Sequence, residues 1–247
     1  MKLIILCGGM GTRLKEETEY KPKPMVEIGG KPIVWHIMKI YSHYGFNEFI
    51  LALGYKGNII RDYFINYFYY NNDLTIDLGE RDQFTIHSNH NEQQWKVTLL
   101  DTGESSMTGY RVKCAEKYVD EDNFMLTYGD AVSSVNIKEL VDFHFNHNKI
   151  GTVTGVFPPS RFGDLIVKGD NVSSFKEKEK IVKDEKIING GFFIFKKEFF
   201  YMIPNESLCD LERKPLEDLT LKNQLNVFRH DGFWQCMDTY RDYLFLN

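Results

Sequence analysis

Residues 6–25, LCGGMGTRLKEETEYKPKPM, combine glycines with cations in a pattern that suits phosphate binding. Gly8, Gly9 and Gly11 can leave backbone N–H groups exposed, and such groups form an anion cradle when the loop follows a strand. Arg13 adds a guanidinium fork for phosphate oxygens. The glycines alone fit a plain strand-to-helix turn equally well, because they adopt backbone angles that other residues avoid.

Two lysines alternate with prolines soon after this loop, as Lys21-Pro22-Lys23-Pro24. Proline keeps the chain extended and out of a helix, so a lysine beside it can be aimed at a fixed point. Loop lysines are usually only solvated, and the preceding glycines are what favour a phosphate role here.

Two aspartates are candidate ligands for a metal ion. Asp130 ends an apolar strand, where a carboxylate is rare unless something uses it. Asp238 lies far along the chain in the stretch 232–239, and it could instead cap the final helix at 240–246. Mg²⁺ takes one or two carboxylates together with phosphate oxygens. A cradle, cations and a metal are what nucleotidyl transfer needs.

Other candidate residues favour packing over chemistry. His87 with His90, and His144 with His147, have a spacing that permits metal binding, but neither pair has a third ligand. The aromatic run 64–70 suits a core and a subunit contact. A dinucleotide-binding turn is disfavoured, because Gly-x-Gly-x-x-Gly is absent and no acidic residue ends the second strand.

The elements that must position these residues alternate in type over the first 150 residues. Apolar runs predict buried strands at 2–6, 49–53 and 124–128, and amphipathic patterns predict helices at 32–44, 58–70 and 137–148. This alternation indicates an α/β fold, a parallel sheet with helices on both faces. Ligands bind beyond the carboxyl ends of such strands. The loops at 8–13, 54–57 and 129–130 should therefore share one edge.

The rest of the chain predicts additions to this sheet. Short alternating runs at 74–77, 84–87 and 96–100 suggest extra strands added at an edge. Further strands are predicted at 152–157, 164–167 and 192–195, with a tight turn at 169–171. Helix, strand and helix follow in the last thirty residues. Without a repeat or a low-complexity linker, all 247 residues are expected to form one domain.

Composition excludes several classes of protein. A hydrophobic fraction of 43% allows a sizeable core, and a net charge of −5 without a basic stripe argues against nucleic acid as a partner. No apolar stretch reaches the length of a membrane span. The chain opens on a strand without a charged leader, and its four cysteines lack disulfide spacing. We therefore expect a cytoplasmic protein.

Several motifs together resemble the sugar-phosphate nucleotidyltransferases: GGMGTRL, KPKPMVEIGGKPIVWHIMKIYSHYGF, GYKG, DTGESSMTGYR, TYGDAV, FPPSRFG, INGGFF and GFWQCMDTYRD. The similarity runs from Met1 to the end and is closest to the cytidylyltransferases of that family. It implies a Rossmann-like three-layer α/β/α fold with a mixed, mostly parallel central sheet and added edge strands.

The resemblance also implies a reaction. CTP and α-D-glucose 1-phosphate give CDP-glucose and pyrophosphate with Mg²⁺, and CDP-glucose feeds the sugars of bacterial surface polysaccharides. A phosphate oxygen of the acceptor attacks the α-phosphorus in line, so positioning and electrostatics carry the rate. Residues 1–150 would form the nucleotide-binding half and 151–247 the acceptor-binding and C-terminal half. A homo-oligomer, hexamer or tetramer, is implied as well.

Individual roles follow from the matched motifs. Arg13, Lys23 and Asp130 are the implied catalytic residues, and Asp130 and Asp238 are the implied magnesium ligands. The acceptor should meet Lys178, Asn189 and Gly190. CTP should meet Leu6, Cys7, Gly8, Gly9, Met10, Gly11, Thr12, Arg13, Lys23, Ser106, Arg111 and Gly129.

Four departures from the family pattern leave the acceptor and the assembly open. Ala131 replaces the last glycine of Gly-Asp-Gly, Glu179 replaces the proline of Glu-Lys-Pro, and Asp164 replaces the alanine of Phe-Gly-Ala. The chain also ends soon after its final helix. Lys178 could then belong to a solvated Lys/Glu hairpin rather than to the site.

Three alternative functions stay open, and the sequence favours them to different degrees. The nearer one is cytidylyl transfer to a different sugar phosphate or to a non-sugar phosphate. A catalytically silent, nucleotide-binding regulatory subunit would require the loss of Lys23, Asp130 or Asp238, and all three are present. A glycosyltransferase would usually carry Asp-x-Asp after a strand, which Gly-Asp-Ala does not offer.

Overall fold

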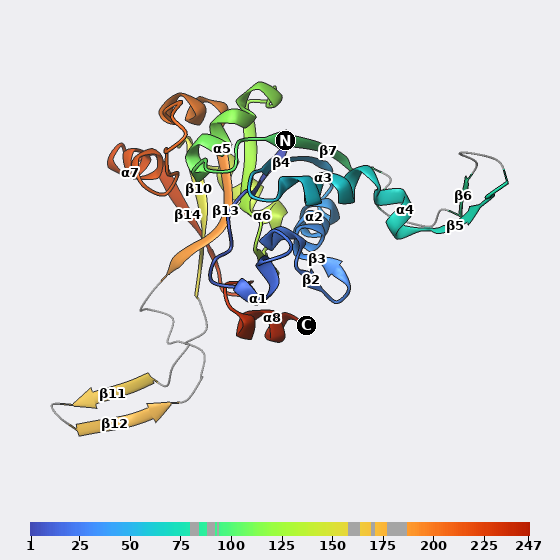
Figure 1. The fold of residues 1–247 in the computed structure, drawn as a ribbon. Helices are drawn as coiled ribbons and strands as arrows, with labels where there is room; N and C mark the ends of the chain where they lie inside the picture. The colour runs from blue at the N-terminus through green and yellow to red at the C-terminus, as the bar shows by residue number, and fades with distance from the viewer. Residues whose placement is uncertain (80–83, 88–91, 93, 158–163, 169–170, 177–186) are drawn as a thin grey trace.

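The computed structural model describes residues 1–79, 84–87, 92, 94–157, 164–168, 171–176 and 187–247. Its centre is a seven-stranded sheet in the order β14-β10-β13-β8-β1-β4-β7 (Figure 1). These strands are β1 (Leu3–Cys7), β4 (Glu48–Leu53), β7 (Lys96–Asp101), β8 (Asn123–Tyr128), β10 (Gly151–Val156), β13 (Ile188–Lys196) and β14 (Leu225–His230).

The sheet is mixed and mostly parallel, as predicted. β1 lies between β4 and β8 and is parallel to both, so that Leu3 pairs with Phe49 on one side and with Met125 on the other. β7 continues the parallel series beside β4, and β14 is parallel to β10. β13 alone among the seven runs against its neighbours, β8 and β10.

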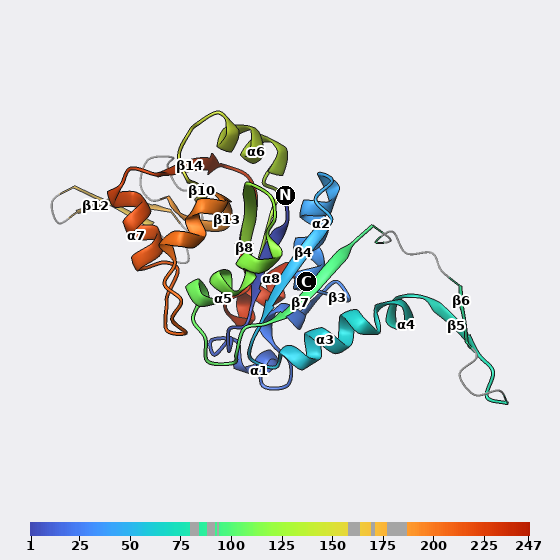
Figure 2. The ribbon, with the colours of Figure 1, turned by 90° about the horizontal axis from the view of Figure 1, so that it is seen from above.

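Helices cover both faces of the sheet, because each central strand is apolar on both sides (Figure 2). Side chains alternate along a strand. Leu3 and Ile5 of β1 therefore pack with α2 (Ile33–His43) and α6 (Ile137–Phe145). Ile4 and Leu6 pack with α5 (Thr108–Ala115) and α7 (Lys214–Leu221) on the opposite face. The three-layer α/β/α prediction is confirmed.

The predicted helix at 58–70 is wrong in one respect, because the structure divides it. α3 (Gly57–Ile65) ends at Asn66, whose N–H still bonds to the carbonyl of Asp62, and α4 (Tyr67–Asn71) follows. The remaining helices are α1 (Lys15–Thr18) and α8 (Tyr240–Leu246), with 3₁₀ turns η1 (Lys23–Met25), η2 (Glu116–Tyr118) and η3 (Lys197–Met202). Among the described residues, no helix has the length and apolarity to span a membrane.

Four small ladders accompany the central sheet. They are β2 (Glu27–Ile28) with β3 (Lys31–Pro32), β5 (Asp73–Ile76) with β6 (Phe84–His87), β9 (Ala131–Ser133) with β15 (Trp234–Cys236), and β11 (Asp164–Lys168) with β12 (Asn171–Lys176). The turn predicted at 169–171 begins outside the described residues.

The prediction of three extra edge strands is right for one and wrong for two. β7 is an edge strand of the central sheet, whereas β5 and β6 pair only with each other and lie away from it (Figures 1 and 2). Their side chains are mostly exposed, so these strands have no apolar face with which to join the core.

Candidate active site

A cavity of about 380 Å³ lies at the carboxyl ends of β1 and β8, at the predicted edge of the sheet. Its walls come from the glycine-rich loop, the Lys-Pro segment, the start of α5 and the two aspartates. The lining residues are Leu6, Gly8, Gly9, Gly11, Thr12, Arg13, Lys23, Pro24, Ser106, Met107, Thr108, Arg111, Tyr128, Gly129, Asp130 and Asp238.

The glycines of the first loop serve different purposes. Gly11 has φ +62°, a left-handed backbone angle that glycine adopts without a steric penalty. A Cβ on Gly8 would lie 2.2 Å from the guanidinium carbon of Arg111, so a side chain there has no room. Gly9 has no atom within 4 Å of such a Cβ and faces open space. The glycine pattern therefore meets several structural needs: a left-handed backbone angle at Gly11, room for Arg111 at Gly8 and an open position at Gly9.

Arg111 fastens the cavity floor to three strand ends. The side chain is 4% exposed, and its guanidinium donates five hydrogen bonds within the protein. The acceptors are the carbonyls of Gly8 (3.1 Å), Leu53 (3.0 Å), Gly103 (2.9 Å) and Glu104 (3.1 Å) and the Thr102 hydroxyl (2.5 Å). The loops after β1 and β4, which were predicted to share one edge, are thus held together with the loop after β7, which was not part of that prediction.

Lys23 lies between the two aspartates. Its Nζ is 2.7 Å from Oδ2 of Asp130 and 2.7 Å from Oδ1 of Asp238. Pro22 is extended and directly precedes η1, which begins at Lys23. Burial alone would lower the pKa of Lys23, but the neighbouring carboxylates raise it above its ordinary value, so the amine stays charged. Arg13 reaches the same place, with Nη1 2.7 Å from Oδ2 of Asp238.

A short ladder brings the two aspartates together across 108 positions of sequence. Cys236 of β15 pairs with Ala131 of β9, and the next residue, Met237, donates its N–H to the Asp130 carbonyl (2.8 Å). Asp130 enters one strand of this ladder and Asp238 leaves the other. Ala131, one of the departures from the family pattern, is 3% exposed in this ladder.

The alternative reading of Asp238 as a helix cap is wrong. Thr239 caps α8 instead, in a capping box: its hydroxyl accepts from the N–H of Asp242, and Asp242 accepts from the N–H of Thr239. Asp238 is left to face Lys23 and Arg13. Burial would raise the pKa of Asp238, but the Lys23 hydrogen bond and the two cations outweigh it and hold this pKa below its ordinary value.

The donor set in the described part of the chain suits a hard cation. Carboxylate oxygens of Asp130 and Asp238 and the thiol of Cys236 lie within 4.8 Å of one another. Burial raises the pKa of the Cys236 thiol, so the two carboxylates are the charged donors of this set in the metal-free protein. Two carboxylates beside a phosphate cradle fit Mg²⁺, which completes its shell with phosphate oxygens and water.

The other predicted nucleotide residues are not all at the cavity. Leu6, Gly129 and Ser106 line it, and the Ser106 hydroxyl donates to the Thr102 carbonyl (2.6 Å). Cys7 is 1% exposed in the core, and Met10 is 54% exposed. In the part of the chain that the structure describes, neither of these two belongs to the cavity wall.

Two of the three predicted acceptor residues, Asn189 and Gly190, lie at the start of β13, and neither lines the cavity. The Asn189 amide donates to the Tyr128 hydroxyl (3.1 Å), and the Gly190 carbonyl accepts from the indole of Trp234 (2.8 Å). Lys178 lies outside the described residues, as does its neighbour Glu179.

Sequence reasoning missed four lining residues, Pro24, Met107, Thr108 and Tyr128. Three of them had a positional signal. Tyr128 ends β8 directly before Gly129 and Asp130, and Met107 and Thr108 stand between Ser106 and Arg111 in one motif.

The histidine pairs do not contribute to this site. His144 is 2% exposed, and a ring nitrogen of His144 and of His147 each lies 2.8 Å from the Thr152 hydroxyl. This packing role agrees with the interpretation from sequence, and burial lowers the pKa of His144 to about 4. His87 contacts Thr75, and His90 lies outside the described residues.

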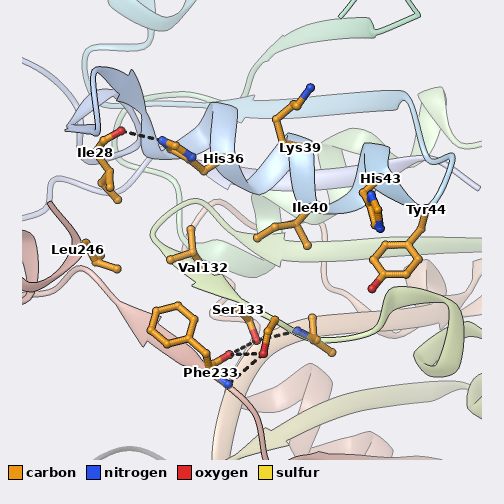
Figure 3. Close-up of a pocket in the computed structure, with 12 residues that line it drawn as sticks. Ile28, His36, Lys39, Ile40, His43, Tyr44, Val132, Ser133, Phe233 and Leu246 are labelled. Carbon is orange, nitrogen blue, oxygen red and sulfur yellow. Dashed lines mark hydrogen bonds between the residues drawn. The ribbon is translucent and has the colours of Figure 1, made fainter. Parts of the chain in front are cut away.

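A second cavity, of about 650 Å³, lies between α2, β9 and Leu246 of α8 (Figure 3). Its walls are mainly apolar, and Figure 3 shows Lys39 pointing away from it; Lys39 pairs with Glu92 (2.9 Å). His36 lies 2.8 Å from the Ile28 carbonyl. None of the residues predicted to act on substrate lines this cavity among those described.

Comparison with known proteins identifies the family. The nucleotidyl transferase family profile matches residues 2–243. The chain is 49% identical over 247 residues to glucose-1-phosphate cytidylyltransferase of Salmonella typhimurium, covering 100% of this chain and 94% of that protein. It is 42% identical to the probable glucose-1-phosphate cytidylyltransferase of Bacillus subtilis, covering 100% and 95%.

A solved structure supports the fold. HddC from Yersinia pseudotuberculosis, crystallised with GMP-PN, superposes with a TM-score of 0.69 at 26% identity, covering 99% of this chain and 97% of that one. The family predicted from the motifs is confirmed. By its sequence over the full length and by its fold, the chain belongs to the nucleotidyl transferase family.

Proposed function

We propose that this protein transfers the cytidylyl group of CTP to α-D-glucose 1-phosphate, giving CDP-glucose and pyrophosphate. One observation carries the proposal: Lys23 holds Asp130 and Asp238 together beside a glycine-rich cradle. The chain in which this occurs is 49% identical, over its whole length, to a glucose-1-phosphate cytidylyltransferase.

In this proposal the first loop binds the triphosphate of CTP. Gly8, Gly9, Gly11 and Thr12 line the cavity, and their backbone N–H groups would donate to phosphate oxygens. Arg13 and Lys23 supply the positive charge that the triphosphate and the leaving pyrophosphate require. Arg111 acts through the loop floor, because its guanidinium is occupied by backbone carbonyls.

Asp130 and Asp238 would hold Mg²⁺, which when bound supplies charge neutralisation at the reacting phosphates. With the carboxylates occupied by the metal, the Lys23 ammonium would pair with the phosphates instead. A phosphate oxygen of the acceptor attacks the α-phosphorus, and the bond to the β-phosphate oxygen breaks in line with it. This direct displacement needs no nucleophilic side chain of the protein.

A homo-oligomer is part of this proposal. Large apolar side chains are exposed along α3, α4, β5 and the turn after it: Ile65, Phe68, Tyr70, Ile76 and Leu78, the last 94% exposed. Large exposed apolar side chains of this kind support a subunit contact along these elements. By resemblance to the family we propose a hexamer or a tetramer, which light scattering after gel filtration would distinguish. We place the enzyme in the cytoplasm, where its two substrates are made.

The test is pyrophosphate release with CTP, UTP, dTTP, ATP and GTP against a panel of sugar and non-sugar phosphates. CTP with glucose 1-phosphate should give the highest kcat/KM. A higher value with UTP or dTTP would refute cytidylyl transfer. A higher value with another phosphate would favour the alternative acceptor, and no turnover with any pair would favour a silent nucleotide-binding subunit.

A further inference from the structure

Two polar side chains of the cavity wall, those of Tyr128 and Thr108, have no part in the nucleotide or metal roles above, and they contact Glu212 and Asn189, which do not line the cavity. The Tyr128 hydroxyl donates to Oε1 of Glu212, and the Thr108 hydroxyl donates to Oε2 of the same carboxylate (2.7 Å). Asn189 donates to the Tyr128 hydroxyl (3.1 Å). We call this set the Glu212 cluster.

The Glu212 cluster is held by four separate segments. Tyr128 ends β8, Asn189 begins β13, Thr108 opens α5, and Glu212 precedes α7. The Leu211 N–H donates to the Thr108 hydroxyl (2.9 Å), which fastens the segment before α7 to α5. Because hydrogen bonds reach both oxygens of Glu212 from different segments, the direction of its carboxylate is fixed.

Room for the tyrosine ring is made by a glycine on the neighbouring strand. Gly191 has φ +81°, and a Cβ there would lie 2.5 Å from the Tyr128 ring. The ring therefore lies over Gly191 with its hydroxyl between Asn189 and Glu212. The Asn189 carbonyl oxygen is itself held by the Gly191 N–H (2.8 Å).

The chemistry of the cluster defines what it can bind. Each Glu212 oxygen keeps a second lone pair, and the Asn189 amide keeps a second N–H. Both residues are exposed, and Tyr128 and Thr108 line the cavity. A carboxylate accepts from hydroxyl groups and repels phosphate. A neutral ring with several hydroxyls fits this end of the site, with its phosphate directed toward Lys23.

We propose that Glu212, oriented by Tyr128 and Thr108, accepts hydrogen bonds from hydroxyl groups of the acceptor's sugar ring, while Asn189 donates to one of them. Glu212 is then a specificity-determining residue of the transfer reaction. The inference rests on the proposed function, since it assigns the sugar end of that acceptor. It also favours a sugar phosphate over a non-sugar phosphate that carries further negative charge.

The test compares Glu212→Gln and Tyr128→Phe with the parent and with Glu217→Gln. Glu217 is an exposed glutamate of α7 outside the cavity wall, which makes it a matched control. Glu212→Gln should raise KM for glucose 1-phosphate about tenfold or more, the effect of losing a charge-assisted hydrogen bond. Tyr128→Phe should raise it less, because the carboxylate remains. KM for CTP should stay within about twofold, and Glu217→Gln should match the parent.

Deoxy analogues of glucose 1-phosphate distinguish the loss of a hydrogen bond to the sugar from a general effect of the substitution on the fold. In the parent, removal of a hydroxyl that Glu212 binds should lower kcat/KM, and in Glu212→Gln the same removal should cost much less. An equal penalty in parent and variant for every deoxy analogue would overturn the inference. So would an unchanged acceptor KM in both variants. Failure of the proposed function would look different, because the parent itself would then not use glucose 1-phosphate.

Discussion

Replacement of Lys23 by methionine tests the arrangement at the centre of the site. Methionine keeps the length and the apolar stem of lysine but removes the ammonium. In the structure that ammonium lies 2.7 Å from a carboxylate oxygen of Asp130 and 2.7 Å from one of Asp238. Without it, two carboxylates remain side by side, and Arg13 is the cation that still contacts Asp238 in the described part of the chain. We expect the metal-free protein to be destabilised.

The magnitude follows from burial. Removal of one partner of a buried ion pair costs about 3–5 kcal/mol. The Lys23 side chain is 11% exposed, but those of Asp130 and Asp238 are 27% and 19% exposed. Water can therefore solvate part of the residual charge, which places the expected loss at the lower end, about 3 kcal/mol. For a chain of this size that lowers Tm by about 6–12 °C.

The assay is thermal unfolding of parent and Lys23→Met, in EDTA and in millimolar MgCl₂. Mg²⁺ should raise Tm more in the variant, because in the parent the cation competes with the ammonium for the same carboxylates. Lys21→Met is the matched control. Lys21 lies in the same Lys-Pro segment, but its nearest carboxylates, Glu17 and Glu27, are 3.9 and 4.0 Å away, so its loss should change stability by under about 1 kcal/mol.

Two results would refute this reasoning. If Lys23→Met unfolded in EDTA at the same temperature as the parent, the lysine would not be compensating the aspartates. If Mg²⁺ stabilised the parent more than the variant, the ammonium and the metal would not share a site. The activity of Lys23→Met should fall whichever of these results is obtained, because the positive charge that would face the phosphates is lost.

Three further predictions follow from named contacts. Asp130→Asn and Asp238→Asn should each stay folded and lower kcat at least about a hundredfold; since Thr239 caps α8, near-normal turnover in Asp238→Asn would exclude it as a metal ligand. Gly8→Ala should cost about 1–3 kcal/mol of stability in urea unfolding, because its Cβ meets Arg111, whereas Gly9→Ala should leave stability unchanged and raise KM for CTP. The buried neutral His144, with its pKa lowered to about 4, should weaken the fold as pH falls from about 6.5 to 4, by about 3 kcal/mol in total, because the unfolded chain takes up the proton first; His144→Gln should lose this part of the pH dependence.

The central sheet was predictable because its strands are buried on both faces. Runs such as Leu3–Cys7 and Glu48–Leu53 carry this signal locally, whichever strand lies beside them. The pairing of β5 with β6 was not predictable in the same way. Alternating residues look alike in an edge strand and in a separate ribbon, and the partner is chosen by contacts that no short window contains.

The sequence around Asp238 contains the signal of a helix N-cap, but that signal belongs to the next residue, Thr239. Thr239 and Asp242 stand three residues apart before an apolar run, which is the pattern of a capping box. Assigning the cap to Thr239 would have left Asp238 without a structural role and strengthened its prediction as a metal ligand. Its approach to Asp130 depends on the β9–β15 ladder, which the sequence did not indicate.

Arg111 shows why a motif alone cannot assign direct contact with a nucleotide. Three parallel strands that end at one edge leave carbonyls with no partner in the sheet, and a guanidinium has five N–H donors to satisfy such a set. The buried guanidinium needs space beside the backbone. Gly8 and Gly54 leave that space, since a Cβ on either would lie within 2.3 Å of the Arg111 guanidinium. An arginine beside a glycine-rich loop can therefore serve the backbone instead of the ligand. The burial of the arginine side chain decides between these two roles, and a residue pattern does not reveal that burial.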